Sequence, residues 1–301
     1  MAFSELYYKF GAKLVNSKLR YTGNIWHYTS SEALKGILTN KNIWFSDRRF
    51  LNDPMECSYL YQLLNENENL FRNYNKNFRA LLKKIINNFI TMECYVGGNI
   101  VIPQFTCYLA SFSCSKDNLE LWNYYTKSQK LTGYAISFNV EDFIKLLKDK
   151  YDCIYGKVIY NKDEQIQIVK EMLDAYNRDY ELKHGNSPYI VEENYLCELA
   201  YILEFYNIFF KQEAYYNEQE YRFVIYENQA IKNNYINKEF RICNDIFIPY
   251  VKINLPRNII KEIMISPSIN KTLLQKGITE FKNCTIFSDA KCTISKIIKR
   301  Y

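Results

Sequence analysis

The stretch Ile25-Trp26-His27-Tyr28-Thr29-Ser30 opens the core of this chain and decides its fold. Its β-branched and aromatic residues predict a strand over 24–29. Thr29-x-x-Glu32 has the spacing of a capping box, and the apolar face that follows predicts a helix that Asn40 closes. Residues 42–46 favour a second strand. A strand, a short helix and another strand are therefore expected in succession.

The rest of the chain alternates helical and strand patterns without a regular rhythm. Asp53-Pro54-x-Glu56 predicts a helix start, with Asp53 as the cap and Pro54 at the first helical position. Further helices are expected over 76–93, 117–125, 140–149, 163–181 and 190–211, with a short one ending at Gly277. Further strands are expected near 105–113, 133–138, 154–160, 220–227, 245–253, 261–265 and 284–287. This irregular order predicts the α+β class.

Length and composition indicate a globular protein. The chain has 301 residues, of which 48% are apolar and 24% are charged. We predict one domain over 1–301, with its core from about 24 to 301 and helical insertions near 54–93 and 163–211. A net charge of +6 permits a polyanionic partner without requiring one. No leader or membrane-spanning apolar run is visible, so a cytoplasmic protein without a membrane partner is expected, with its oligomeric state open.

Several kinds of chemistry are not expected from this sequence. Nine cysteines are scattered without a C-x-x-C pair and only two histidines are present, so no metal site is predicted and the cysteines are expected to be small buried side chains. Glycine-rich nucleotide loops and a nucleophile elbow are missing. His184 lies in a polar stretch that favours a solvent-facing loop. His27 is therefore the histidine expected to act.

A series of motifs carries a family resemblance. They are Ile25-Trp26-His27-Tyr28-Thr29-Ser30, Leu34-x-x-Ile37-Leu38, Ile43-Trp44-Phe45-Ser46, Asn52-Asp53-Pro54-x-Glu56, Ser111-Phe112-Ser113, Leu121-Trp122-x-x-Tyr125, Gly133-Tyr134-Ala135-Ile136-Ser137-Phe138, Glu218-Gln219-Glu220-Tyr221-Arg222 and Ile260-Lys261-Glu262-Ile263-Met264-Ile265-Ser266-Pro267. In this order and spacing they resemble the bacterial family DUF2971, whose function is unknown. The resemblance covers residues 24 to 301.

This family pattern in turn resembles the ADP-ribosyltransferase fold. The resemblance implies a split mixed or antiparallel sheet core, and NAD as the substrate. It also implies a histidine on the first core strand and a glutamate at the start of a later strand. His27 and Glu220 match these positions and are expected to be catalytic, with Glu218 as the alternative carboxylate. Phe112, Tyr125 and Phe45 compete for the aromatic position that packs on nicotinamide.

The implied chemistry explains these residue types. Loss of nicotinamide from NAD leaves an oxocarbenium-like ribose, which the carboxylate of Glu220 would stabilise. His27 would donate a hydrogen bond to a ribose hydroxyl, and Arg49 or Arg222 would neutralise the pyrophosphate. The residues expected to bind NAD are His27, Tyr28, Thr29, Ser46, Arg49, Phe112, Tyr125 and Arg222.

The resemblance therefore implies an enzyme that transfers ADP-ribose from NAD to a nucleic acid or a protein. By analogy, such an enzyme would act as a bacterial toxin or phage-defence effector. One alternative is a non-catalytic module of the same fold that binds nucleic acid or protein, and another is an NAD glycohydrolase. In a purely structural interpretation, His27 is a core histidine and Arg222 forms an ion pair with Glu220.

Overall fold

The computed structural model describes residues 4–51, 53, 55, 57–91, 106–125, 133–185, 193–227, 236–268 and 270–298. The chain divides into two compact units. The first, here called the helical unit, comprises residues 1–20, 51–105 and 158–216. The second, here called the sheet unit, comprises residues 21–50, 106–157 and 217–301. Each unit is described by itself.

The sheet unit contains one ten-stranded sheet. Its strands are β1 (Asn24–Thr29), β2 (Asn42–Asp47), β3 (Cys107–Ser113), β4 (Tyr134–Asn139), β5 (Cys153–Lys157), β6 (Glu220–Tyr226), β7 (Lys238–Cys243), β8 (Ile246–Asn254), β9 (Ile260–Ile265) and β10 (Lys291–Ile294). All neighbouring strands run antiparallel except β9 and β10, which are parallel. The mostly antiparallel sheet and its helices confirm the α+β class.

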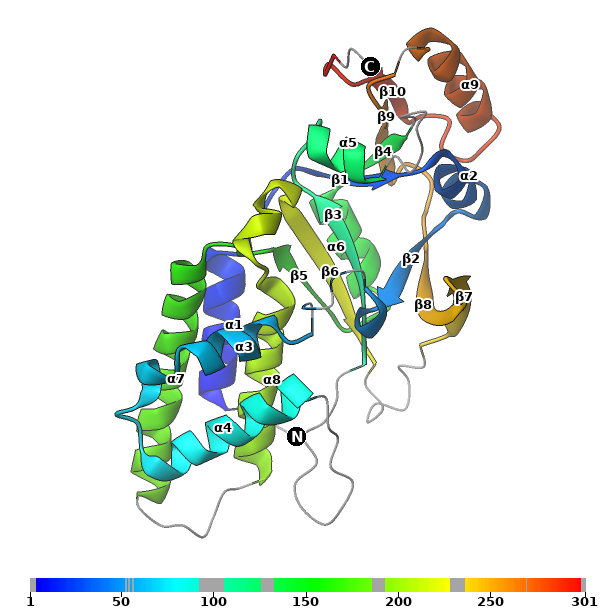
Figure 1. The fold of residues 1–301 in the computed structure, drawn as a ribbon. Coiled ribbons are helices and arrows are strands. Elements are labelled where there is room, and N and C mark those ends of the chain that lie inside the picture. The colour runs from blue at the N-terminus through cyan, green and yellow to red at the C-terminus, as the bar shows by residue number, and fades with distance from the viewer. Residues whose placement is uncertain are drawn as a thin grey trace. The chain divides into compact units, whose positions relative to one another are not determined.

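The sheet branches at β3 (Figure 1). One edge of β3 pairs with β6 along the whole strand, and β6 pairs in turn with β5. The other edge is divided: Ser113 pairs with Trp26 of β1, whereas Leu109 pairs with Ser46 of β2. From this point β1 continues to β4, β9 and β10, and β2 continues to β8 and β7. Between the two contacts, the described strands leave a short stretch of the β3 edge without a strand partner.

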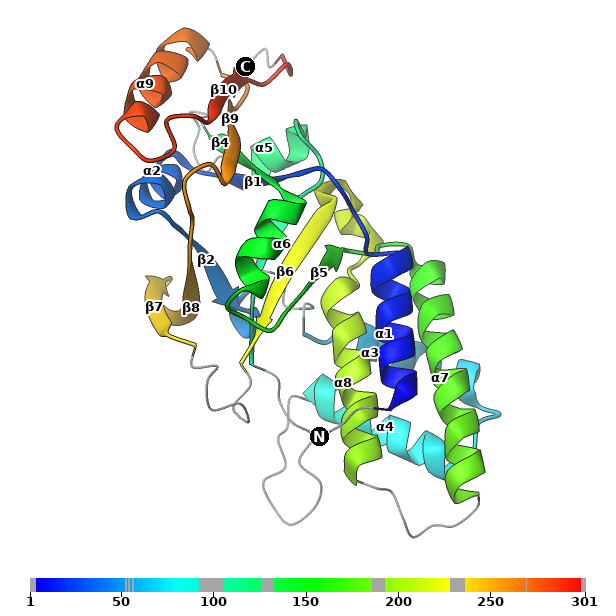
Figure 2. The same cartoon turned by 180° about the vertical axis from the view of Figure 1, so that it is seen from behind.

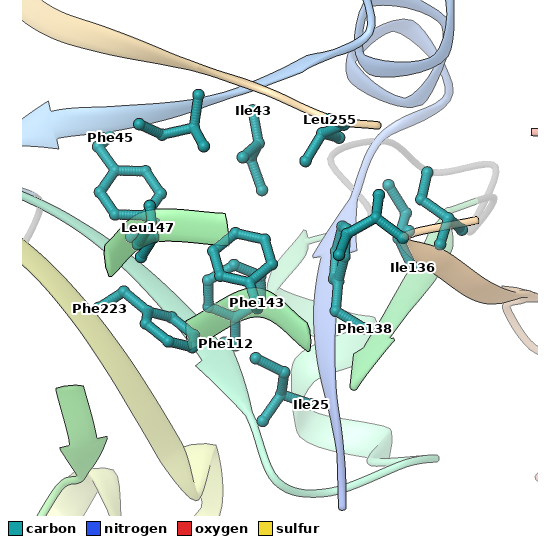
Figure 3. Packing of buried hydrophobic residues seen from close by; sticks show 14 of the residues in the cluster. Ile25, Ile43, Phe45, Phe112, Ile136, Phe138, Phe143, Leu147, Phe223 and Leu255 are labelled. Carbon is teal, nitrogen blue, oxygen red and sulfur yellow. The ribbon is translucent and has the colours of Figure 1, made fainter. Parts of the chain in front are cut away.

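Helices cover both faces of the sheet unit. They are α2 (Ser31–Asn40), α5 (Leu119–Tyr125), α6 (Val140–Lys148) and α9 (Lys271–Asn283), with a 3-10 turn η1 at Arg48–Phe50. Phe143 of α6 packs on Phe112 and Phe223 (Figure 3), at ring distances of 5.3 and 4.7 Å. On the opposite face, Leu121 and Trp122 of α5 pack among side chains of β1, β4 and β9. Burial of each such aromatic side chain stabilises the fold by about 2 kcal/mol.

The helical unit is built from amphipathic and buried helices. They are α1 (Glu5–Ser17), α3 (Tyr59–Glu66), α4 (Lys76–Thr91), α7 (Lys162–His184) and α8 (Glu193–Phe209), with 3-10 segments η2 at Glu68–Phe71 and η3 at Glu213–Glu218. Helices α1, α7 and α8 lie side by side in both views (Figures 1 and 2). Ser4 caps α1 and also donates to the carboxylate of Glu198, which fixes the start of α1 against α8. None of the helices in the described part of the chain combines the length and the hydropathy that a membrane crossing requires.

Most predicted elements are confirmed, with four corrections. Ser30, rather than Thr29, caps α2, because its side chain accepts the N–H of Ala33. The side chain of Asp53 accepts the N–H of Met55 in a turn, and the next helix begins only at Tyr59. Pro54 and Glu56 lie outside the described residues.

Two corrections concern the C-terminal part. Helix α9 continues through Gly277 to Asn283, and the last strand is at 291–294 rather than 284–287. A Cβ added to Gly277 would meet nothing within 4 Å, and the residues that follow pack on the core, so packing overrides the low helix propensity of glycine. The sequence patterns predicted neither helix α1 nor strand β7.

Two further expectations concern side chains and domains. His184 is the last residue of α7 and packs on Tyr180 at 4.9 Å, so the predicted solvent-facing loop is wrong. The described cysteines are all free thiols and range from buried Cys107 to exposed Cys284. The predicted helical insertions at 54–93 and 163–211 fall within the helical unit, and a single domain over 1–301 stays a prediction.

Candidate functional site

A small pocket lies in the sheet unit where β1 separates from β3. Its lining comes from β1, β3, α5 and the start of β6, and consists of Trp26, His27, Tyr28, Ser111, Phe112, Ser113, Leu121, Glu218 and Glu220. Its volume is about 20 Å³. A cavity of this size holds about one water molecule or one hydroxyl group. The pocket thus joins His27 and Glu220, the two residues that the sequence predicted to act together.

His27 and Glu220 reach this pocket from different faces of the sheet. Trp26 pairs with Ser113, which pairs with Glu220, so these three side chains share one face. By alternation His27 belongs to the other face, where its ring lies 5.8 Å from that of Phe112. Both residues line the pocket because β1 leaves β3 after a single pair, so that His27 lies beside the edge of β3 that no described strand covers, while its side chain stays on the face opposite that of Glu220.

The His27 side chain is kept neutral by its surroundings. Burial lowers its pKa to about 4, and a hydrogen bond with the Ser111 backbone opposes this shift only in part. A neutral imidazole has one N–H donor and one acceptor nitrogen. The N–H is used on the Ser111 carbonyl, so the other nitrogen is an acceptor. This differs from the predicted role of His27 as a donor to ribose.

Glu220 forms a buried ion pair at the bottom of the site. Its Oε2 lies 2.6 Å from Nε of Arg222, and the two side chains are 8% and 1% exposed. The alternate positions on β6 place both on the same face. A buried carboxylate in contact with a guanidinium is held in its charged form, because either charge alone in that environment would be far more costly. Arg222 therefore accompanies Glu220 and is not placed to contact a pyrophosphate in solvent.

Ser111 connects the two predicted catalytic residues. Its backbone bonds to His27, and its hydroxyl donates to Oε2 of Glu220 at 3.2 Å. The next residue of this face, Ser113, donates to the backbone carbonyl of Glu218 at 2.8 Å. Neither serine was among the predicted site residues. Their position on alternate residues of a predicted strand, opposite the Glu-x-Glu-x-Arg motif, was the available sequence signal.

A backbone kink brings both glutamates of the Glu-x-Glu motif to the pocket. Gln219 has φ of 46°, in the left-handed region that a residue with a Cβ seldom adopts. This conformation costs about 1 kcal/mol. The carbonyl of Gln219 accepts the N–H of Cys114 at 2.8 Å, which continues the pairing of β3 and β6 beyond the strand. Without the kink, Glu218 and Glu220 would follow a straight strand.

Tyr28 lines the pocket and holds neighbouring segments of the chain in place. Its hydroxyl donates to the carbonyl of Ser115 at 2.9 Å and accepts the N–H of Asn118 at 3.1 Å. Its ring meets Trp122 edge-on at 4.7 Å. Tyr28 thereby fixes the segment between β3 and α5. Burial of the side chain raises the pKa of its hydroxyl, which stays protonated at neutral pH.

Four of the described residues predicted to bind NAD do not line this pocket: Arg222, which lies behind Glu220 in the ion pair, and Thr29, Ser46 and Arg49. Thr29 is buried at the end of β1, and Ser46 lies on β2, where its hydroxyl accepts from Arg241 at 3.4 Å. Arg49 lies in η1, and its guanidinium donates two hydrogen bonds to the carboxylate of Asp47, at 3.0 and 2.6 Å. Ser46 and Arg49 are close in sequence to the first motif but lie outside the pocket, because β2 and β1 contact different parts of the β3 edge.

The three candidate aromatic residues also separate. Phe112 contributes to the pocket wall but is only 2% exposed. Phe45 is fully buried and stacks on Phe143 at 6.4 Å, so it cannot face a ligand in this structure. Tyr125 ends α5, and its side chain lies outside the described part of the structure. A partly exposed cation, Lys116, lies beside the pocket residue Trp26: its ammonium is 5.2 Å from the ring and pairs with Glu262 at 3.1 Å.

The fold and the site together define a class of protein. It is an α+β protein with a branched, mostly antiparallel sheet, in which His27 and the carboxylate member of a buried Glu220–Arg222 ion pair line one pocket. Among the described residues, no group of three or more His, Cys, Asp or Glu side chains is arranged to hold a metal ion.

Comparison with known proteins gives the family. Residues 121–223 match the model of the family described as "Protein of unknown function (DUF2971)". The matched segment runs from α5 to β6 and includes the pocket residues Leu121, Glu218 and Glu220. The predicted resemblance to DUF2971 is confirmed over this segment, which is shorter than the predicted range of 24 to 301. No curated protein and no solved structure matches the chain.

Proposed function

We propose that this protein binds NAD at the His27–Glu220 pocket and cleaves its glycosidic bond, transferring ADP-ribose to a nucleic acid or a protein. The observation that carries the proposal is that His27 and Glu220, 193 positions apart in the sequence, line one pocket. The charged state of Glu220 and the neutral state of His27 suit the chemistry. A role as a toxin or defence effector would follow from such an activity.

The carboxylate of Glu220 would act on the reacting ribose. As the bond between C1 of ribose and the nicotinamide nitrogen breaks, the electron pair leaves with nicotinamide and positive charge develops on the ring. A carboxylate fixed beforehand by Arg222 and Ser111 stabilises this charge without rearranging. The acceptor then bonds to C1 and releases its proton to Glu218 or to solvent.

The pocket size limits what enters it. A volume of about 20 Å³ accommodates a ribose hydroxyl and not a whole dinucleotide, which needs several hundred Å³. We therefore assign only the ribose hydroxyl to the pocket, where the acceptor nitrogen of His27 would receive its proton in a hydrogen bond. The ammonium of Lys116, which lies beside Trp26 and pairs with Glu262 at 3.1 Å, would meet a phosphate by exchanging this partner. This replaces the roles predicted for Arg49 and Arg222.

Nicotinamide release from NAD tests the proposal. We expect Glu220→Gln to lower the rate by about 100-fold or more, the magnitude typical of losing one transition-state charge contact. His27→Ala should lower it by about tenfold, as expected for one hydrogen bond. Matched controls are Glu239→Gln, an exposed glutamate of β7, and His184→Ala, the other histidine. Unchanged release in both site variants, with the fold intact, would refute the site.

A non-catalytic binding module is the second candidate, and the small pocket favours it. Such a protein would release no nicotinamide under any condition. It would instead bind nucleic acid with an affinity that falls steeply as salt increases. Release of nicotinamide without labelling of any macromolecule would identify a glycohydrolase. Mass spectrometry of the acceptor fraction separates transfer from hydrolysis.

A further inference from the structure

The helical unit contains a second cavity that the proposed function does not use. It lies among α1, α7 and α8 and has a volume of about 180 Å³. Its lining consists of Phe10, Lys13, Leu14, Ser17, Lys18, Glu164, Gln167, Ile168, Glu171 and Tyr206. All of these residues belong to the helical unit, so the cavity is complete within that unit.

The base of this cavity is apolar. Phe10 and Leu14 lie one turn apart on α1 and are buried, and Ile168 of α7 is partly buried. Tyr206 of α8 is 1% exposed, and its hydroxyl reaches the carbonyl of Phe10 at 3.5 Å. Burial raises the pKa of this hydroxyl, which remains neutral. No charged side chain is among these four residues.

Charged side chains at the rim neutralise one another. Lys13 pairs with Glu171, and Lys18 pairs with Glu164 at 2.8 Å. The residue numbers rise along α1 and fall along α7, so the two helices run antiparallel. The rise of an α-helix separates the pairs by about 7.5 Å along α1 and about 10.5 Å along α7. The two pairs together carry no net charge.

We infer that this cavity is a binding site for a small neutral aromatic molecule, from one six-membered ring up to the size of indole. A cavity of about 150 Å³ lined by apolar side chains binds benzene, so about 180 Å³ suits a ring of this range. An anion would have to displace Glu164 or Glu171 from its lysine, and a cation would have to displace the lysine. Neutral ligands avoid both costs. The inference does not depend on NAD chemistry.

Indole is the probe for the test. Isothermal titration of the full chain with indole should show one site, and indole should raise the melting temperature of the protein by mass action. Ile168→Phe fills the cavity from α7, and Ser17→Phe closes it from the exposed last turn of α1. Both variants should lose the titration signal and at least three quarters of the indole-dependent shift.

The matched control is Asn16→Phe, which adds the same ring to the adjacent exposed position outside the lining. It should bind indole as the original chain does. Benzoate and benzylamine should bind at least tenfold more weakly than indole. The absence of indole binding, or equal binding by the original chain, Ser17→Phe and Ile168→Phe, would overturn the inference. Ser17 is exposed, so a folding failure of Ile168→Phe leaves the test decisive.

Discussion

The two sites place ion pairs in opposite surroundings. In the sheet unit, Glu220 and Arg222 meet with side chains that are 8% and 1% exposed, and a serine hydroxyl completes the contact. In the helical unit, Lys18 and Glu164 are 48% and 36% exposed and border an apolar cavity. Water solvates the second pair but not the first. The comparison teaches that burial, more than the residue types, decides how much the loss of one partner of an ion pair lowers the free energy of unfolding.

The largest effect is expected from removing one member of the buried pair. Arg222→Met should lower the free energy of unfolding by about 3–5 kcal/mol, because it leaves the Glu220 charge buried without its guanidinium. Urea denaturation followed by tryptophan fluorescence measures this loss. Adding Glu220→Gln to Arg222→Met should recover most of it.

The matched control is Lys252→Met, which removes the cation from an exposed pair with Glu239 in the same unit. It should cost far less than Arg222→Met, because solvent screens the pair. If Arg222→Met and Lys252→Met cost the same, the buried pair has no special energetic role and the comparison fails.

A pH dependence is expected next. The folded pKa of His27 is lowered to about 4, whereas in the unfolded chain it is near 6.5. Between these two pH values the unfolded chain binds more protons at His27 than the folded protein does. The free energy of unfolding is therefore at its full value above pH 6.5 and decreases as the pH falls toward 4. The shift corresponds to about 3 kcal/mol.

His27→Gln should remove this part of the pH dependence. We expect unfolding at pH 7 and pH 4.5 to differ less in His27→Gln than in the original chain, by about 2 kcal/mol, the part of the linkage that falls between these two pH values. His184→Gln is the control and should keep the original dependence. Parallel curves for the original chain and His27→Gln would mean that folding does not lower the pKa of His27.

A moderate effect is expected at Ser111. Ser111→Ala removes the hydroxyl that donates to Glu220, at a cost of about 1.5 kcal/mol for a hydrogen bond to a charged group. The backbone contact with His27 should remain. Nicotinamide release should fall less than in Glu220→Gln, since the carboxylate keeps Arg222. A variant with unchanged stability and unchanged release would show that Ser111 does not position Glu220.

The smallest effect is expected at the rim of the helical cavity. Lys18→Met should change the free energy of unfolding by about 1 kcal/mol or less, because the pair with Glu164 is exposed. Added salt should reduce even this difference by screening. Measuring the original chain and Lys18→Met in low and high salt checks the prediction. A cost above about 2 kcal/mol would indicate that the rim pairs hold α1 and α7 together.

Local patterns determined most of the elements. The apolar and β-branched residues of β1 and the amphipathic spacing of α4 and α6 identify their structures within a few residues. The predicted end of α9 and the predicted start of α3 were wrong. Packing extends α9 through Gly277, and a turn at Asp53 precedes α3. Strand β7 was missed because Phe240 and Ile242 are exposed on an edge strand, contrary to the usual pattern.

By itself, the sequence determined the α+β class, the DUF2971 relationship and the pairing of His27 with Glu220 as candidates. Tertiary structure decided which other residues join them. Ser111 and Glu218 enter the pocket, whereas Ser46 and Arg49 follow β2 away from it. The physical reason is the branch at β3: sequence patterns report which face a side chain takes, but only the pairing of distant strands determines which edges part and leave room for a site.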